Sequence, residues 1–408
     1  MKELDVLIVG AGPAGLSAAM FLAKRGIAST VVEKEKFPRD KICGDALSGK
    51  VVEILNRLDK GLANEISGDT KFLGSWGVTF VAPGGQQLRV PFRHGNEGII
   101  PPGFISKRMD FDNWLYAKAT SYGCVEIREN TIIRDYKKTA EGITATSKDG
   151  SVFKARIIIA ADGAYSSFAK EMAGIRTQPE HNCFGLRAYY KNVGGQNDGN
   201  FIELHFLKEI LPCYFWIFPL PDGYCNVGIG VRADKAAAGK INLKRTFEDI
   251  LENNATIKAR FAQAERVGEI KLFGLPLGSK RRRLSGAHYI LCGDAAQLID
   301  PFTGEGIGNA MMSGMLAAEQ AAECLACNDF SARCIVQYDK MLYRRVGDEL
   351  KLSTVLARLV NYPWLFDYVV RKANSNHLLR ETISCMFEDL DMRARLQSPL
   401  FYLKLIFS

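Results

Sequence analysis

Short apolar runs recur at widely separated positions along the chain and predict strands buried in a sheet. The clearest runs, rich in β-branched or other apolar residues, cover 6–9, 29–32, 156–160 and 289–292. Runs of this length and character are typical of strands that are covered on both faces, as in a parallel sheet. Because long segments separate the runs, we expect one sheet whose sequence is interrupted by other structure.

Helical patterns follow several of these runs. Residues 16–25 are rich in Ala, Leu and Met and stop before Gly26, a residue that commonly ends helices. Residues 110–121 place Phe111, Leu115 and Ala119 on one face of a helix. Further helices are predicted over 242–263, over 307–324, and from 331 to the end of the chain with breaks at Pro363 and Pro399.

The pattern changes between the third and fourth apolar runs. From 183 to 232, aromatic and β-branched residues recur between Gly and Pro turns, which predicts a sizeable antiparallel sheet. Segments 77–82 and 87–91 flank a Pro-Gly-Gly turn and indicate a hairpin. We therefore predict an α/β protein with a discontinuous nucleotide-binding domain (1–72, 100–176 and 275–330), a β-rich domain (73–99 and 177–274) and a helical C-terminal region (331–408).

Composition narrows the classes of protein. The chain has 408 residues, of which 47% are hydrophobic, and no stretch long enough to span a bilayer. Acidic residues at the N-terminus argue against a signal peptide, so we expect a cytoplasmic protein with reduced thiols. The 10 cysteines include no CxxC pair, and we predict no metal site.

A glycine-rich turn directly follows the first apolar run. Gly10, Gly12 and Gly15, with Pro13 and Ala14 between them, give the spacing GxGxxG at a strand-to-helix junction. In this motif the first glycine permits the turn, the second lets the backbone approach a pyrophosphate, and the third lets the helix pack on the strand. The free N–H groups at the start of the helix favour the bound negative charge.

An acidic residue stands where the motif needs one. Glu33 ends the second apolar run, 23 residues after Gly10, where a carboxylate hydrogen-bonds adenosine ribose hydroxyls. We place the neighbouring Lys34 among the cofactor-binding candidates. A carboxylate disfavours a 2′-phosphate at this position, so the motif indicates FAD or NAD rather than NADP.

Two later segments resemble the motifs of flavoprotein hydroxylases, and this resemblance favours FAD. One is the Asp162-Gly163 turn; the other runs from Gly293-Asp294 through Pro301 to Gly304-Glu305-Gly306-Ile307. The resemblance implies that Asp294 binds a ribityl hydroxyl and that the backbone of 304–307 lies by the flavin pyrimidine. It also places Arg108 against the FAD phosphates, with a solvated surface arginine as the alternative and the adjacent Lys107 as a competitor.

Two more segments resemble the geranylgeranyl reductase family within that superfamily. They are Lys41-Ile42-Cys43-Gly44-Asp45-Ala46-Leu47 and Leu211-Pro212-Cys213-Tyr214-Phe215-Trp216-Ile217-Phe218-Pro219. The resemblance implies that Cys43 and Gly44 lie near the isoalloxazine and that Tyr214 and Trp216 line an apolar cavity. Many members have a second glycine where this chain has Asp45. The Trp-x-Trp-x-Ile-Pro signature of flavin halogenases matches less well, because its first Trp is Tyr214 here and its Ile is Phe218.

This resemblance predicts a reductase that saturates carbon–carbon double bonds of a polyprenyl group on a lipid or quinone. Cys43, Tyr214 and Trp216 are the candidate catalytic residues, with Cys43 donating a proton or supporting redox chemistry. Only one dinucleotide motif is present, so electrons would come from a transient reductant, either NAD(P)H or a ferredoxin-like protein. A flavin monooxygenase acting on an aromatic or apolar substrate and a non-catalytic flavin electron-transfer protein remain as alternatives.

The net charge of +8 bears on partners. The basic run at 280–283 has no accompanying nucleic-acid-binding motif, so we expect no nucleic acid partner. Residues 400–407 are apolar and aromatic but too few to cross a membrane. They either pack on the body of the protein or form an amphipathic anchor at the inner face of the membrane.

Overall fold

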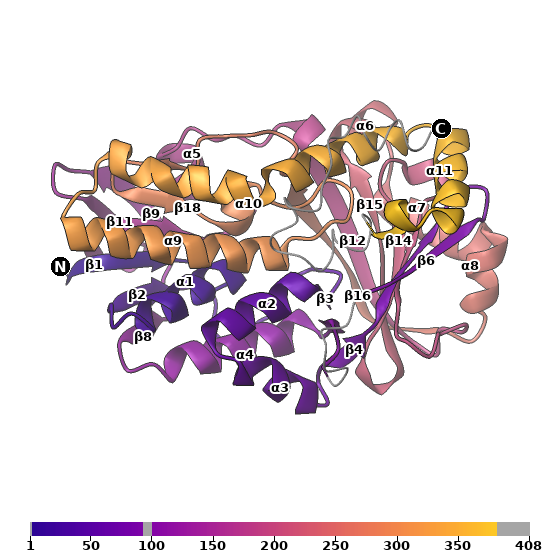
Figure 1. The fold of residues 1–408 in the computed structure, drawn as a ribbon, viewed down its shortest axis with the longest axis horizontal. Helices are drawn as coiled ribbons and strands as arrows, with labels where there is room; N and C mark the ends of the chain where they lie inside the picture. The colour runs from indigo at the N-terminus through magenta and orange to yellow at the C-terminus, as the bar shows by residue number, and fades with distance from the viewer. Residues whose placement is uncertain (1, 93–99, 382–408) are drawn as a thin grey trace.

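The computed structural model describes residues 2–92 and 100–381, and its two large sheets lie side by side (Figure 1). The first sheet has the order β17-β18-β11-β1-β2-β8, with β10 and β9 extending it from the first half of β11. Its strands are β1 (Lys2–Val9), β2 (Ser29–Val32), β8 (Val125–Arg128), β9 (Ile133–Lys138), β10 (Ile143–Ser147), β11 (Val152–Ala160), β17 (Ser285–Gly286) and β18 (Tyr289–Leu291).

The four strands predicted from the apolar runs are neighbours in this sheet. β1 pairs in parallel with β2 and with β11, and β11 pairs in parallel with β18. The expectation of one interrupted parallel sheet is confirmed. β11 begins four residues before the predicted start, because its first half pairs with β10 and is less apolar than its second half.

Helices cover the parallel sheet. α1 (Pro13–Ala23) packs against the long helix α9 (Ile307–Cys327), and α4 (Arg108–Thr120) packs against α1. A Cβ atom at Gly314 would lie 2.1 Å from the carbonyl oxygen of Ala14. The two helix backbones are therefore closer than ordinary side chains allow, which explains the small residues of α9.

The second sheet has the order β16-β12-β15-β14-β13-β5-β6. It is antiparallel as predicted, except that β13 and β5 pair in parallel. Its strands are β5 (Gly77–Val81), β6 (Gln87–Pro91), β12 (Asn182–Lys191), β13 (Ile202–His205), β14 (Phe215–Pro219), β15 (Tyr224–Arg232) and β16 (Glu265–Pro276). Two helices, α7 (Leu243–Asn253) and α8 (Ala255–Arg260), replace the single helix predicted over 242–263, because Asn254 ends one and caps the next.

A third, small sheet lies in the segment between β2 and α4. It consists of β3 (Ala46–Leu47), β7 (Gly103–Ile105) and β4 (Leu73–Ser75). The remaining short elements are α2 (Gly49–Leu58), α3 (Gly61–Gly68), α5 (Ser167–Glu171), α6 (Ala233–Ala238) and the 3-10 turns η1 (Pro179–His181), η2 (Lys208–Ile210), η3 (Pro221–Gly223) and η4 (Gly293–Ala296).

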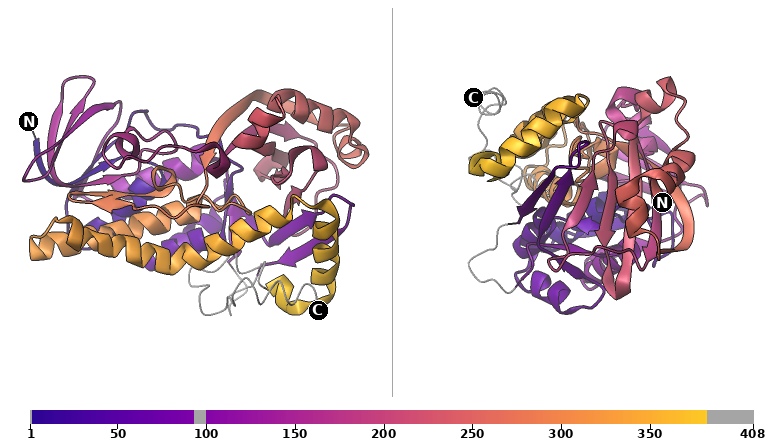
Figure 2. Two further views of the ribbon diagram at one scale, coloured as in Figure 1. Left: turned by 90° about the horizontal axis from the view of Figure 1, so that it is seen from above. Right: turned by 90° about the vertical axis from the view of Figure 1, so that its right-hand side faces the viewer.

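The C-terminal helices connect the two halves of the molecule. α10 (Ala332–Leu359) packs against α9 and β17, and α11 (Pro363–Ser375) packs against β6 (Figure 2). The first part of α10 contributes Tyr338 and Leu342 to the core of the parallel sheet, whereas Leu352 and Leu359 join the core of the second sheet. Pro363 starts α11 as predicted, but Pro399 and the apolar stretch 400–407 lie outside the described residues. No helix among 2–92 and 100–381 is long and apolar enough to cross a membrane.

Candidate active site

The glycine motif builds one wall of a cavity at the carboxyl end of the parallel sheet. Gly10 has φ +99°, and a Cβ atom there would lie 2.4 Å from the Ala161 carbonyl oxygen. A Cβ atom at Gly15 would lie 1.9 Å from the Gly10 carbonyl oxygen. At Gly12 the nearest atom, of Arg39, is 3.9 Å away. Gly10 and Gly15 are therefore required by packing, whereas Gly12 leaves open space beside the start of α1.

Glu33 lies at the edge of this open space. Its carboxylate accepts hydrogen bonds from the backbone N–H groups of Ala11, at 2.7 Å, and Glu35, at 3.0 Å. It is buried, while the adjacent Lys34 is exposed and also lines the cavity. The carboxylate thus organises the glycine turn as well as facing the position expected for a ribose.

The cavity has a volume of about 560 Å³ and brings the three predicted motifs together. Its lining includes the predicted residues Gly10, Gly12, Pro13, Ala14, Glu33, Lys34, Arg108, Asp162, Gly163, Gly293 and Asp294. The open position at Gly12 and the uncapped N-terminus of α1 fit a pyrophosphate, and the volume fits the nucleotide half of FAD. We call this space the nucleotide cavity.

The Asp162 and Asp294 carboxylates already have protein partners. Asp162 accepts a hydrogen bond from Ser166 Oγ at 2.6 Å, at the start of α5. Asp294 forms an ion pair with Lys41 at 2.7 Å. Sequence reasoning did not assign Lys41 a role, and only its place beside Cys43 in the chain pointed to it.

Arg108 is the first residue of α4 and is buried, so the alternative of a solvated surface arginine is wrong. Its guanidinium binds both carboxylate oxygens of Asp112 at 2.7 Å. Asp112 also accepts from Arg39 at 2.8 Å, and these arginines keep the pKa of Asp112 low despite its burial. Arg39 lies beside the glycine turn, where its guanidinium donates to the Ala11 carbonyl at 3.2 Å. Lys107 faces the ring of Tyr224 instead, with 4.2 Å to the ring centroid.

A second cavity, of about 160 Å³, lies next to the first and is lined by the second large sheet, the small third sheet and the start of α9. The two share lining residues, including Pro13, Lys41, Arg108 and Asp294. The predicted residues that line it are Pro13, Cys43, Gly44, Arg108, Tyr214, Trp216, Asp294, Gly304, Glu305, Gly306 and Ile307. We call it the inner cavity. Of the predicted site residues, Gly15 and Pro301 line neither cavity.

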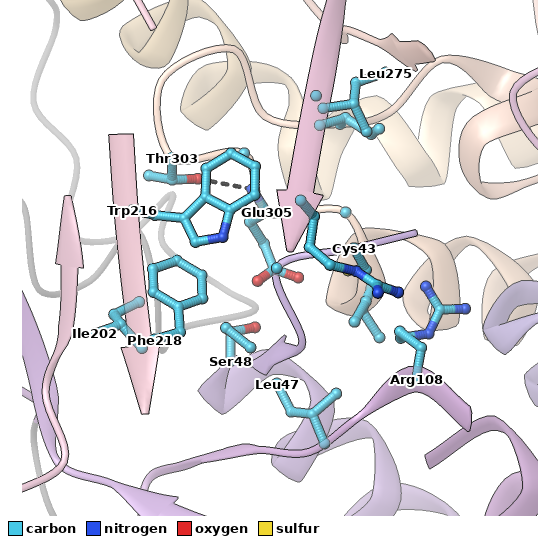
Figure 3. Close-up of a pocket in the computed structure, with 18 of the residues that line it drawn as sticks. Cys43, Leu47, Ser48, Arg108, Ile202, Trp216, Phe218, Leu275, Thr303 and Glu305 are labelled. Atoms are coloured by element: carbon cyan, nitrogen blue, oxygen red, sulfur yellow. Dashed lines mark hydrogen bonds between the residues drawn. The ribbon is translucent and has the colours of Figure 1, made fainter. Parts of the chain in front are cut away.

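Hydrogen bonds fix the aromatic wall of the inner cavity. Trp216 Nε1 donates to Asn226 Oδ1 at 2.8 Å, and the Tyr214 hydroxyl donates to the Thr303 carbonyl at 2.7 Å. Figure 3 shows Trp216 and Phe218 projecting from β14 on the same side. Tyr214 therefore supports the loop that precedes α9, and Trp216 has one fixed orientation.

Cys43 lies on the opposite wall from these rings (Figure 3). Burial raises the pKa of its thiol, the nearby Arg108 acts to lower it, and Asp45 acts to raise it. The Asn226 side chain donates to the Cys43 carbonyl at 2.7 Å and to the Asp45 carboxylate at 2.8 Å. Asn226, which sequence reasoning missed, links Trp216 to the Cys43 segment.

Asp45 is fully buried and has φ +70°, a conformation that favours glycine but that Asp tolerates. Besides the Asn226 amide, it accepts hydrogen bonds from the Tyr189 hydroxyl at 2.8 Å and the Arg108 backbone N–H at 3.3 Å. Burial raises its pKa to about 6 in spite of these donors. The Asp45 carboxyl therefore changes its charge near pH 6.

This raised pKa predicts a fall in stability as the pH rises. The folded protein holds the Asp45 proton up to about pH 6, whereas the unfolded chain releases it near 3.8, so stability is lost between these values. The shift corresponds to about 3 kcal/mol at 1.36 kcal/mol per pKa unit. We expect Asp45→Asn to flatten this part of the pH profile in urea unfolding at pH 4 and pH 7. Asp198→Asn, at an exposed position, is the control, and an unchanged profile for Asp45→Asn would contradict the assignment.

Comparison with known proteins agrees with this geometry. Residues 3–186 match the family model described as FAD binding domain. The digeranylgeranylglycerophospholipid reductase 1 of Methanothermobacter thermautotrophicus is 31% identical over 356 residues, which cover 86% of this chain and 85% of the relative.

Solved structures support the same fold. A geranylgeranyl bacteriochlorophyll reductase-like protein from Thermoplasma acidophilum superposes with a TM-score of 0.80 at 24% identity, covering 100% of both chains. The flavin-dependent brominase Bmp2 also reaches 0.80, at 22% identity, covering 100% of this chain and 98% of its own. The fold alone thus does not separate reductases from halogenases, but the sequence match does. The chain belongs to the geranylgeranyl reductase family of FAD-dependent oxidoreductases.

Proposed function

We propose that this protein saturates carbon–carbon double bonds of a polyprenyl group carried on a lipid or quinone. The observation that carries the proposal is the inner cavity, an apolar and aromatic space that lies next to the nucleotide cavity and shares lining residues with it. Its apolar walls come from several elements and include Leu47, Phe92, Phe104, Ile202, Trp216, Phe218 and Leu275. Relatives named as digeranylgeranylglycerophospholipid reductases support the substrate class.

The size of the inner cavity limits what it holds. Its volume of about 160 Å³ is below the ~300 Å³ that small-molecule pockets commonly reach. We therefore expect it to hold one stretch of a polyprenyl chain beside the cofactor, with the remainder of the substrate outside.

The residues of the chain supply placement and exclusion of water. Reduced FAD, when bound, supplies the hydride for one alkene carbon. An isolated alkene has no carbonyl group to accept charge, so orientation and a dry site provide much of the rate. Trp216, held by Asn226, and Tyr214, held by the Thr303 carbonyl, give the cavity a fixed shape. Cys43 remains the predicted proton donor or redox partner, and the external electron source is either NAD(P)H or a ferredoxin-like protein.

An anaerobic reaction tests this function against the monooxygenase alternative. FAD-loaded protein is reduced chemically without oxygen and mixed with phospholipid vesicles that contain a geranylgeranyl lipid or a prenylated quinone. We expect products that gain two hydrogen atoms for each bond reduced, detected by mass spectrometry. A strict requirement for oxygen, with a hydroxylated product, would reject the reductase.

The same samples test membrane contact. Tyr362 and Trp364, at the start of α11, are exposed aromatic residues of the kind that favour the bilayer interface. We expect the protein to sediment with the vesicles, and protein that stays in the supernatant would argue against peripheral contact.

A further inference from the structure

A buried cluster of one lysine and three carboxyl groups lies beside the inner cavity, and the function proposed above assigns no chemistry to these side chains. Its members are Lys50 on α2, Glu349 on α10, and Asp300 and Glu305 on the loop before α9. All four are buried. We call these residues the carboxyl cluster.

Lys50 and Glu349 form the ion pair of the cluster, and Glu305 and Asp300 act on Lys50 through their charges. Lys50 Nζ contacts Glu349 Oε1 and lies 3.4 Å from Asn309 Oδ1. The Glu305 carboxylate accepts from the Gly308 N–H at 2.6 Å. A Cβ atom on Gly308 would lie 2.7 Å from Lys50 Cβ and 2.9 Å from Glu305 Oε1, so the absence of a side chain at Gly308 lets both residues approach the start of α9.

The third carboxylate, of Asp300, is held separately. It accepts from the backbone N–H groups of Phe302 and Thr303, at 2.9 Å and 2.8 Å, and from Ser353 Oγ of α10 at 2.5 Å. The cluster therefore sets one lysine against three carboxyl groups, so Lys50 can balance the charge of only one of them.

Burial and repulsion among the carboxylates favour a proton on the cluster near neutral pH. Burial raises the pKa of Glu349 to about 7, with Lys50 acting to lower it and the two other carboxylates acting to raise it. Burial also raises the pKa of Glu305, with Lys50 again opposing the shift and Asp300 adding to it. A proton on one of these carboxyls lowers the excess negative charge of this buried site.

One member of the cluster connects it to the cavity. Glu305 lines the inner cavity, whereas Lys50, Asp300 and Glu349 do not. Figure 3 shows the Glu305 carboxylate pointing toward Ser48, with Trp216 next to it in the same cavity. A proton held by the cluster therefore has an exit toward a bound substrate through Glu305.

We propose that the carboxyl cluster is a proton store and that Glu305 donates its proton to the double bond during reduction. This inference rests on the function proposed above. The hydride and its electron pair, supplied by the reduced flavin, form a bond to one alkene carbon. The O–H bond of Glu305 breaks as a C–H bond forms at the other carbon, which leaves Glu305 as a carboxylate. The cluster takes up a proton from solvent between turnovers, which restores the acid form of Glu305.

This assignment makes Glu305 a rival of Cys43 for the donor role. The raised pKa of the buried Cys43 thiol makes it a weak acid, while a carboxylic acid with a raised pKa is a stronger donor near neutral pH. The backbone carbonyl of Cys43 also accepts a hydrogen bond from the Asn226 side chain, which gives the Cys43 segment a structural role.

The test compares Glu305→Gln with Glu323→Gln, a change at an exposed position of α9, the helix that follows Glu305. In the anaerobic assay with excess reductant, we expect Glu305→Gln to slow double-bond reduction at least ~100-fold, the usual lower range for a lost general acid. Glu323→Gln should reduce double bonds at the wild-type rate. Cys43→Ser should lose less of this rate than Glu305→Gln does. Infrared spectra of the FAD-loaded protein at pH 7 give a second readout, the C=O band of a protonated carboxyl group.

The outcomes separate the two proposals. Loss of the infrared band and of the rate in Glu305→Gln supports the donor role. An unchanged rate and band in Glu305→Gln, or a larger loss of rate in Cys43→Ser, overturns it while the reductase function stands. A wild type that reduces no polyprenyl substrate rejects the function and the donor role with it, whereas the band still shows whether the cluster holds a proton.

Discussion

Replacing Lys50 by methionine is expected to lower the free energy of unfolding by about 3–5 kcal/mol near pH 8, the usual cost of leaving a buried charge unpaired. Lys50 is 1% exposed and is the cation that pairs with Glu349. Methionine fills a similar volume, so the loss of the charge dominates over the loss of packing. Urea unfolding of the protein as purified measures the difference, with Lys60→Met at an exposed position as the control.

The same variant has a pH dependence with a definite sign. The folded-state pKa of Glu349 lies at about 7, above its ordinary value of 4.5, so the Glu349 carboxyl lowers stability as the pH rises from about 4.5 to about 7. Without Lys50 this pKa rises further, because the lysine acts to lower it. We therefore expect a smaller loss from Lys50→Met at pH 5, where Glu349 is protonated in both folded proteins. An equal loss at pH 5 and pH 8, or a loss below ~1 kcal/mol at pH 8, would contradict the charge balance argued for the cluster.

Whether a site residue was predicted or missed depends on how close its partners lie in the sequence. The glycine turn, Glu33 and the strand at 6–9 lie within one βαβ unit, where spacing alone determines which residues meet. The buried runs at 156–160 and 289–292 have no partner in the sequence nearby, yet their apolar character was enough to place them in the same sheet. The short apolar runs thus predicted the parallel sheet.

The missed residues depend on contacts between distant segments. Lys50 and Glu349 are 299 residues apart, and each looks like an ordinary surface residue of an amphipathic helix until α2 and α10 both pack against α9. Asn226 lies on β15, which pairs with β14. Only the pairing of Phe218 with Asn226 in these two strands brings the Asn226 amide to Trp216 and Asp45. No spacing rule within the chain identifies such partners, because the tertiary packing creates them.

Two alanine substitutions in the glycine motif are expected to separate cofactor binding from folding. Gly12 has φ −80°, which alanine adopts without strain, and its Cβ atom would have no neighbour closer than 3.9 Å. The added methyl group would occupy the space where the backbone must approach the pyrophosphate. We expect Gly12→Ala to weaken FAD binding at least ~100-fold, or about 2.7 kcal/mol, and to leave the unfolding free energy of the FAD-free protein within ~0.5 kcal/mol of the wild type.

Gly15→Ala provides the matched comparison three residues away on the same helix. Its Cβ atom would lie 1.9 Å from the Gly10 carbonyl oxygen and 3.2 Å from the Ile8 side chain, so α1 must move away from β1. Overpacking of this kind costs about 1–3 kcal/mol, and the FAD-free protein should lose that much stability. Fluorescence titration with FAD and urea unfolding of both variants measure the two effects independently. Tight FAD binding by Gly12→Ala would mean that the pyrophosphate does not lie against this turn, and the proposed place of the flavin beside Cys43 and Glu305 would then have to change.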